Sequence, residues 1–116
     1  MRITALFTAF LLLLFAAGGV SAVSITDDLG VTVTIENPPE RIVSLSPANS
    51  EILFALGLDE KIVGVTEYCT YPEAALSKEK IGGFSTVNIE KVSVLNPDLI
   101  VAADGNSEET VAHLRE

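Results

Sequence analysis

The sequence predicts an α/β fold, in which a β-hairpin precedes a parallel sheet with helices on both faces. Short apolar runs rich in β-branched residues are typical of strands buried on both faces, and three occur, at Ile42–Leu45, Ile62–Val65 and Leu99–Ala102. Helical patterns follow them, so strand and helix alternate along the chain. A polar loop follows each run, at the edge where open α/β sheets bind their ligands.

Residues 1–22 are expected to be a secretory signal peptide. Met1-Arg2 is positively charged, residues 3–17 are almost entirely apolar, and Val20-Ser21-Ala22 offers small residues for cleavage after Ala22. A retained membrane anchor is the alternative interpretation. As a helix, however, the apolar stretch spans only about 22 Å, less than the ~30 Å hydrocarbon core of a bilayer. We therefore expect a mature domain of residues 23–116.

Composition excludes several function classes. The formal net charge is −9, and it becomes −10 if Arg2 is removed with the signal peptide, so binding to nucleic acid or anionic membranes has no electrostatic basis. Cys69 is the only cysteine, which rules out an intrachain disulfide, and we interpret it as a free or half-buried thiol. His113 is the only histidine and is expected to be a solvated helix residue, because one histidine cannot build a metal site.

The mature domain is expected to begin with a β-hairpin over Val23–Ile35, in which two β-branched runs flank the turn Asp27–Gly30. The central unit is Arg41–Gly57. Its strand stops at Ser46, a good helix N-cap, and Pro47 suits the first helical position. Apolar residues then recur at helical spacing (Ile52, Leu53 and Leu56), and Gly57 is placed to end the helix in a left-handed conformation.

The second unit begins with a polar turn at Asp59–Lys61 and the strand Ile62–Val65, and continues into a loop over residues 66–71. Pro72 is expected to open a short helix that runs through Leu76, and Lys78–Lys80 is expected to be charged and solvated. The glycines that follow invite a phosphate-loop interpretation, but the lysine and dinucleotide patterns of such loops are absent.

The third unit begins with a helix over Ile89–Leu95, which Asn88 can cap and on which Glu90 points away from the apolar face. The strand Leu99–Ala102 and the loop 104–107 follow. The segment Glu108–Glu116 begins another helix, and the chain stops there, so we expect a fragment or a truncated gene.

Several of these motifs resemble those of the cobalamin- and ferric-siderophore-binding proteins of ABC importers. The matching segments are Ser46-Pro47-Ala48-Asn49-Ser50-Glu51, Tyr68, Tyr71-Pro72, Asn88-Ile89-Glu90-Lys91 and Asn96-Pro97-Asp98-Leu99-Ile100. Two earlier segments, Ile25–Gly30 and Pro39–Ser44, are similar to the iron-chelate branch of that family.

The resemblance implies a Rossmann-like N-terminal lobe of a two-lobe periplasmic substrate-binding protein, of which residues 23–116 form an incomplete lobe. It implies an exported monomer, in the periplasm or at the outer face of the cytoplasmic membrane. Such a protein captures a metal chelate (cobalamin or another corrinoid, a ferric siderophore or haem) and delivers it to a membrane permease. It performs no bond chemistry, and no cofactor, bare metal or catalytic residue is implied.

The resemblance also implies functional residues. Those expected to face the ligand are Ser46, Pro47, Ala48, Asn49, Tyr68 and Phe84, and Glu90 is expected to pair with permease arginines. Each has a plainer interpretation that stays open at this point. The first loop can be a helix cap only, Phe84 a core residue, Tyr68 a surface ring, and Glu90 a carboxylate that favours the helix dipole.

Two other function classes stay open. One is a secreted interaction module without a transport role. The other is a secreted hydrolase with Ser46 or Ser50 as nucleophile, but the sequence offers neither a G-x-S-x-G elbow nor a nearby base.

Overall fold

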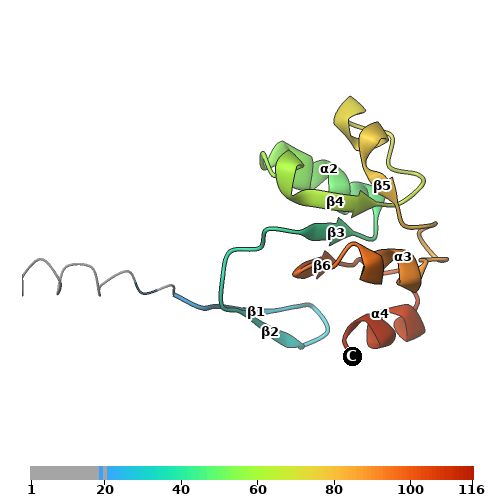
Figure 1. The fold of residues 1–116 in the computed structure, drawn as a ribbon. Coiled ribbons are helices and arrows are strands. Elements are labelled where there is room, and N and C mark those ends of the chain that lie inside the picture. Colours follow the sequence, from blue (N-terminus) through green and yellow to red (C-terminus); the bar gives the residue numbers. More distant parts are fainter. Residues whose placement is uncertain (1–18, 20) are drawn as a thin grey trace, which may run out of the picture. The chain divides into compact units, whose positions relative to one another are not determined.

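The computed structural model describes Gly19 and residues 21–116 (Figure 1). The predicted signal peptide lies almost wholly outside the described residues. The chain divides into two compact units, Met1–Pro38 and Pro39–Glu116. Within the described part of the chain, no helix has both the length and the apolar character that a membrane crossing requires.

The first unit contains the predicted hairpin. Strands β1 (Val23–Thr26) and β2 (Thr32–Ile35) pair antiparallel, and apolar residues alternate with hydroxyl residues along both, so each kind lies on its own face. The hydroxyl pairs Ser24–Thr34 and Thr26–Thr32 are each 2.9 Å apart. The turn is held by the Asp27 carboxylate, which accepts from the backbone N–H groups of Leu29 and Val31.

The second unit is built on a parallel sheet, as predicted, and this sheet has one strand more than the three predicted. Its strands are β3 (Ile42–Ser44), β4 (Ile62–Val65), β5 (Glu79–Lys80) and β6 (Leu99–Val101), in the order β5-β4-β3-β6. The central strand β3 is fully buried, whereas β6 lies at one edge and is only half-buried. Because all four strands run parallel, their carboxyl ends meet at one edge of the sheet, which we call the carboxyl edge.

Helices cover both faces of this sheet, in agreement with the prediction. Helix α2 (Pro47–Ala55) places Leu53 against Ile42 and Ile62 in one apolar cluster. Helix α3 (Ile89–Val94) places Val92 against Val43 and Leu45 in a second cluster, and Leu114 of α4 (Glu108–Leu114) joins that cluster. Each cluster buries residues on one face of the sheet, because successive side chains of a strand point to opposite faces.

Details of α2 follow the sequence signals in part. Ser46 is the N-cap, Pro47 is the first helical residue, and Gly57 has a φ of 78°. Of the three apolar residues at helical spacing, only Leu53 is buried, and Ile52 and Leu56 stay 58% and 68% exposed.

The expectation that Lys78–Lys80 is a solvated charged segment is wrong. Glu79–Lys80 forms the short strand β5, and Lys78 bonds to Asp59 at 2.8 Å. The ammonium group of Lys80 donates to the carbonyls of Cys69 and Ala75, at 3.1 and 2.9 Å. The long lysine stems let the charged groups reach carbonyls and a carboxylate that short polar side chains could not. Two short helices nearby, Asp59–Lys61 and Glu73–Ser77, are 3₁₀ helices.

Two motifs that carried part of the resemblance meet at the opposite edge of the sheet, which we call the amino edge. The carboxylate of Asp98 accepts from the backbone N–H groups of Glu40 and Arg41, each at 2.9 Å. The guanidinium group of Arg41 donates twice to the carbonyl of Leu95, at 2.9 and 2.7 Å. These bonds tie the entry of β3 to the entry of β6 and to the end of α3, so these residues have a structural role.

Candidate functional site

Four loops gather at the carboxyl edge, where the sequence predicts the site. They are residues 45–46 after β3, which lead into the first turn of α2 (residues 47–49), 66–71 after β4, 81–88 after β5 and 102–107 after β6. Because β3 and β4 are neighbours and β6 flanks β3, these loops lie side by side. The N-termini of α2 and α3 start at the same edge, because each helix follows one of these loops.

Hydrogen bonds of three serines stabilise the segment after β3. The Ser46 hydroxyl accepts from the Asn49 N–H at 3.2 Å and so caps α2. The buried hydroxyls of Ser44 and Ser50 lie 2.9 Å apart, and each donates to the Ser46 carbonyl at 3.0 Å. Ser46 is itself only 3% exposed, and Pro47 and Asn49 are half-buried, so Ala48 is the exposed residue among the four predicted ligand-facing residues of this segment.

Phe84, in the loop after β5, lies against the loop after β6. A Cβ atom built on Gly105 would approach its ring to 2.8 Å, so ring and backbone are in close contact. The ring remains partly exposed. Phe84 is therefore neither a fully buried core residue nor a free surface ring, and it can offer one part of its surface to a ligand.

Tyr68, in the loop after β4, is 67% exposed. Its ring passes close to Gly83, where an added Cβ atom would lie 3.6 Å from the ring edge. The backbone N–H of Glu67 also donates to the Gly82 carbonyl at 2.9 Å, which joins this loop to the one that carries Phe84. The two predicted aromatic residues thus stand on adjoining loops.

Glu90 lies in the first turn of α3 and is exposed, as its place in the pattern predicts. The side chain of Asn88 caps this helix by accepting from the Lys91 N–H at 3.0 Å. Ile89, Val92 and Leu95 are buried or half-buried on the other side. Glu90 is therefore available to a partner, and its role in docking stays a prediction.

Asn106 is the residue of this edge that the sequence analysis missed. It is 8% exposed, and its side chain bonds to the backbone of three loops. Within the sequence, Asp104-Gly105-Asn106-Ser107 indicates only a polar loop, and a buried amide cannot be told from a solvated one by residue type. Asn49 also donates its side-chain amide to the Ala102 carbonyl, at 3.0 Å.

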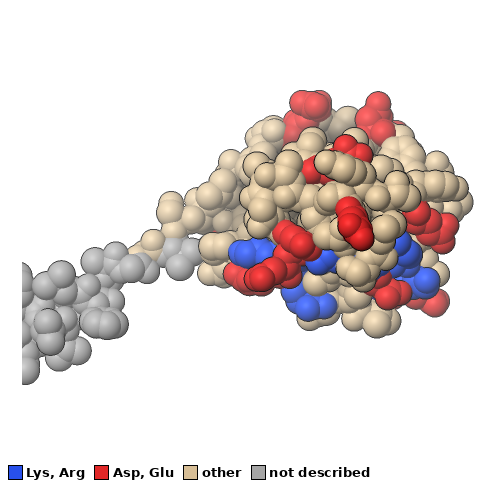
Figure 2. Space-filling model, turned by 90° about the horizontal axis from the view of Figure 1, so that it is seen from above, with Lys and Arg blue, Asp and Glu red and all other residues tan. Residues whose placement is uncertain are grey.

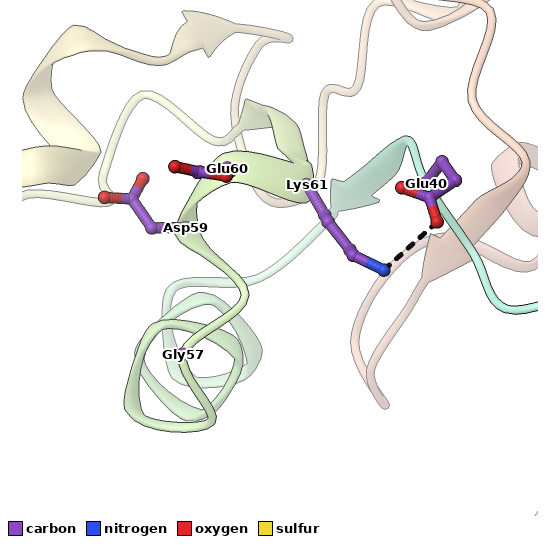
Figure 3. A pocket seen from close by; sticks show the side chains of 5 residues that line it. All are labelled: Glu40, Gly57, Asp59, Glu60 and Lys61. Atoms are coloured by element: carbon purple, nitrogen blue, oxygen red, sulfur yellow. Dashed lines mark hydrogen bonds and ion pairs between the residues drawn. The ribbon is translucent and has the colours of Figure 1, made fainter.

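A pocket of about 500 Å³ lies elsewhere, at the amino edge, and is lined by Glu40, Gly57, Asp59, Glu60 and Lys61 (Figure 3). Three carboxylates line it, and its one cation already bonds to Glu40 at 3.3 Å. None of the predicted ligand-facing residues belongs to it. Across the described residues, no group of three or more histidine, cysteine or acidic side chains is arranged to hold a metal ion.

Charge is distributed without a large basic patch on the face shown in Figure 2, where acidic side chains are spread widely and basic ones lie among them. One carboxyl group departs clearly from its ordinary titration. The backbone N–H groups of Glu40 and Arg41 stabilise the charged form of Asp98 and lower the pKa of that carboxyl, with a smaller contribution from the Arg41 charge.

Comparison with known proteins places this geometry in a family. The sequence profile of the periplasmic binding proteins matches residues 42–114, which span the parallel sheet and its helices. The chain belongs to the periplasmic binding protein family.

Relatives of known sequence include two at 48% identity. An uncharacterised ABC transporter substrate-binding lipoprotein of Bacillus subtilis matches over 84 residues, 72% of this chain and 26% of its own length. The vitamin B12-binding protein of Vibrio cholerae matches over 80 residues, 68% of this chain and 29% of its own length.

Solved structures give the same result for the fold. The crystal structure of the Vibrio cholerae periplasmic vitamin B12-binding protein superposes with a TM-score of 0.64 at 48% identity, over 67% of this chain and 31% of that one. A periplasmic haem-binding protein from Roseiflexus gives 0.63 at 39% identity, over 67% and 30%. The Staphylococcus aureus protein solved with staphyloferrin B gives 0.69 at 29% identity, over 80% and 33%. The chain spans a quarter to a third of the length of these relatives.

Proposed function

We propose that the chain forms part of the ligand-binding site in the substrate-binding protein of an ABC importer, and that the ligand is a metal chelate. The candidate ligands are cobalamin or another corrinoid, a ferric siderophore and haem. The observation that carries the proposal is that two aromatic residues at the carboxyl edge, Tyr68 and Phe84, are exposed or half-exposed and stand on adjoining loops.

The chemistry of such ligands suits this edge. Corrinoids and haem are large, flat macrocycles, and aromatic side chains offer them rigid apolar area while losing little conformational entropy on binding. Among these ligands cobalamin ranks slightly ahead, because Ser46–Glu51, Tyr68 and Tyr71-Pro72 resemble that branch and because relatives at 48% identity are named for vitamin B12. Function as a carrier requires capture and release only, so the proposal includes no reaction.

Residues 23–116 would supply one lobe, and a second lobe would cover the other side of the ligand. Residues 1–22 would direct export to the periplasm or the outer membrane face, and Glu90 would dock the loaded protein on the permease through arginines. Glu90 is exposed in the first turn of α3, where a permease arginine could reach its carboxylate and form a charge-assisted hydrogen bond.

The test needs both a one-lobe and a two-lobe protein. In a Vibrio chimaera, residues 39–116 replace the equivalent segment of the Vibrio cholerae vitamin B12-binding protein. Calorimetric titration with cyanocobalamin, haemin and a ferric siderophore should give sub-micromolar binding of one of them to the chimaera. The 116-residue chain alone should bind more weakly, because about half of the contact surface is missing. A folded chimaera that binds none of the three would contradict the proposal.

A further inference from the structure

Asn106 connects three of the four loops at the carboxyl edge. Its side-chain Nδ2 donates to the carbonyl of Leu45 at 3.0 Å, after β3, and to the carbonyl of Phe84 at 2.8 Å, after β5. Its Oδ1 accepts from the N–H of Ala103 at 2.8 Å, within its own loop after β6. Both polar atoms of this nearly buried side chain are therefore hydrogen-bonded to backbone groups of the three loops.

Only asparagine meets this set of partners at this distance from the backbone. The site requires two donors that face two carbonyls and one acceptor that faces an N–H, and a primary amide provides both on one short stem. Aspartate would place a carboxylate oxygen against the carbonyls of Leu45 and Phe84 with no proton to share. A serine hydroxyl has a single proton and could satisfy only one of the two carbonyls.

The neighbouring residue fixes the ring of Phe84 in addition. Gly105 has a φ of 100°, which side chains rarely adopt, and a Cβ atom there would meet ring carbons of Phe84 at 2.8 and 3.0 Å. The backbone of Phe84 is thus bonded to Asn106 while its ring lies on Gly105. Two independent contacts from the loop after β6 set the position of one ligand-facing aromatic residue.

We propose that Asn106 is a positioning residue of the ligand face, by which we mean the exposed surface of the four loops at the carboxyl edge. Its side-chain amide holds the loops after β3, β5 and β6 in one arrangement. In this arrangement Phe84 and the first turn of α2 present a common surface. The inference rests on the proposed function, because it assigns Asn106 to the same ligand face. It adds a residue that touches no ligand and acts through Leu45 and Phe84.

The first test uses fluorine NMR on the full chain labelled with 4-fluorophenylalanine, with signals assigned through Phe84→Leu and Phe54→Leu. Phe54, on α2, packs against the core and serves as the internal reference. Asn106→Asp should shift or broaden the Phe84 signal and leave that of Phe54 in place. The matched control is Asn88→Asp, the same charge change at an exposed helix cap that aspartate also suits, and it should move neither signal. An unmoved Phe84 signal in folded Asn106→Asp would overturn the proposal.

The second test keeps the proposal falsifiable if Asn106→Asp fails to fold. In the wild-type chain, the side-chain amide protons of Asn106 should exchange with solvent at least about tenfold more slowly than those of the exposed Asn88, because they are bonded and buried. Equal exchange rates would overturn the proposal. Neither test needs a ligand, so a failure of either one counts against the positioning role of Asn106. Failed titrations with cyanocobalamin, haemin and ferric siderophore count against the proposed function alone.

Discussion

Replacement of Tyr68 by alanine separates ligand contact from fold stability more cleanly than any other change at the carboxyl edge. A tyrosine side chain can bury roughly 150–250 Å². With 67% of Tyr68 exposed, about two-thirds of that area is free to meet a ligand. A flat ligand that covers one side of the ring would remove about half of the free area from water. At about 25 cal/mol per Å², Tyr68→Ala should weaken binding by about 1–2 kcal/mol, a factor of about 5 to 30 in Kd.

The assay is calorimetric titration of the Vibrio chimaera with cyanocobalamin, accompanied by thermal unfolding. The melting temperature should barely change, because substitutions at exposed positions usually shift stability by less than about 0.5 kcal/mol. Leu56→Ala is the matched control. Leu56 is 68% exposed but caps the far end of α2, at the amino edge, so its loss should leave binding unchanged. Wild-type affinity in Tyr68→Ala, or an equal loss in Leu56→Ala, would refute the assignment.

Three further predictions concern other residues. In the chimaera, Phe84→Ala should weaken cyanocobalamin binding by about 1–3 kcal/mol and also lower the melting temperature, because the ring lies on Gly105; unfolding with unchanged affinity in the folded fraction would make Phe84 a core residue only. Glu90→Ala should leave ligand affinity near wild type and weaken pull-down of the permease complex at low salt, and Glu90→Lys should weaken it more because it adds repulsion; equal docking by all three proteins would leave Glu90 as a helix-dipole residue. Asp98→Asn should destabilise the chain above about pH 4. Because the pKa of the Asp98 carboxyl is lowered in the folded chain, its stabilising effect is present above the unfolded-state pKa of about 3.9 and is lost as pH falls through the folded-state pKa. Urea unfolding at pH 7 and pH 3 checks that the difference in stability from wild type shrinks in acid.

Local signals in the sequence predict most of the fold. Ser46, Pro47 and Gly57 act on the backbone within a few residues of themselves, so the bounds of α2 follow from residue type. Strand β3 is fully buried, and the short apolar run rich in β-branched residues that contains it is typical of such a strand. The expectation that Lys80 is solvated is wrong because its ammonium group bonds to the carbonyls of Cys69 and Ala75, and no residue pattern shows where a long side chain finds a carbonyl.

The candidate site was predicted only as far as side-chain type indicates a role. Tyr68 and Glu90 are exposed, as a binding or docking role requires. The sequence predicts the Ser46 helix cap, which the structure confirms, but it does not show that Asn106 is buried. Asn106 lies 61 residues from Leu45 and 22 from Phe84, and contacts over such separations depend on tertiary structure.

The central claim is that the ligand binds at the carboxyl edge of the sheet. NMR chemical-shift mapping of the chain titrated with cyanocobalamin tests this claim most directly, because the method detects weak binding and cyanocobalamin is diamagnetic. We predict that the backbone amide signals that move on titration belong to Ala48–Ser50, Glu67–Cys69 and Gly82–Ser85, with little change at the amino edge. Shifts confined to Glu40 and Asp59–Lys61, around the pocket of Figure 3, would contradict the account.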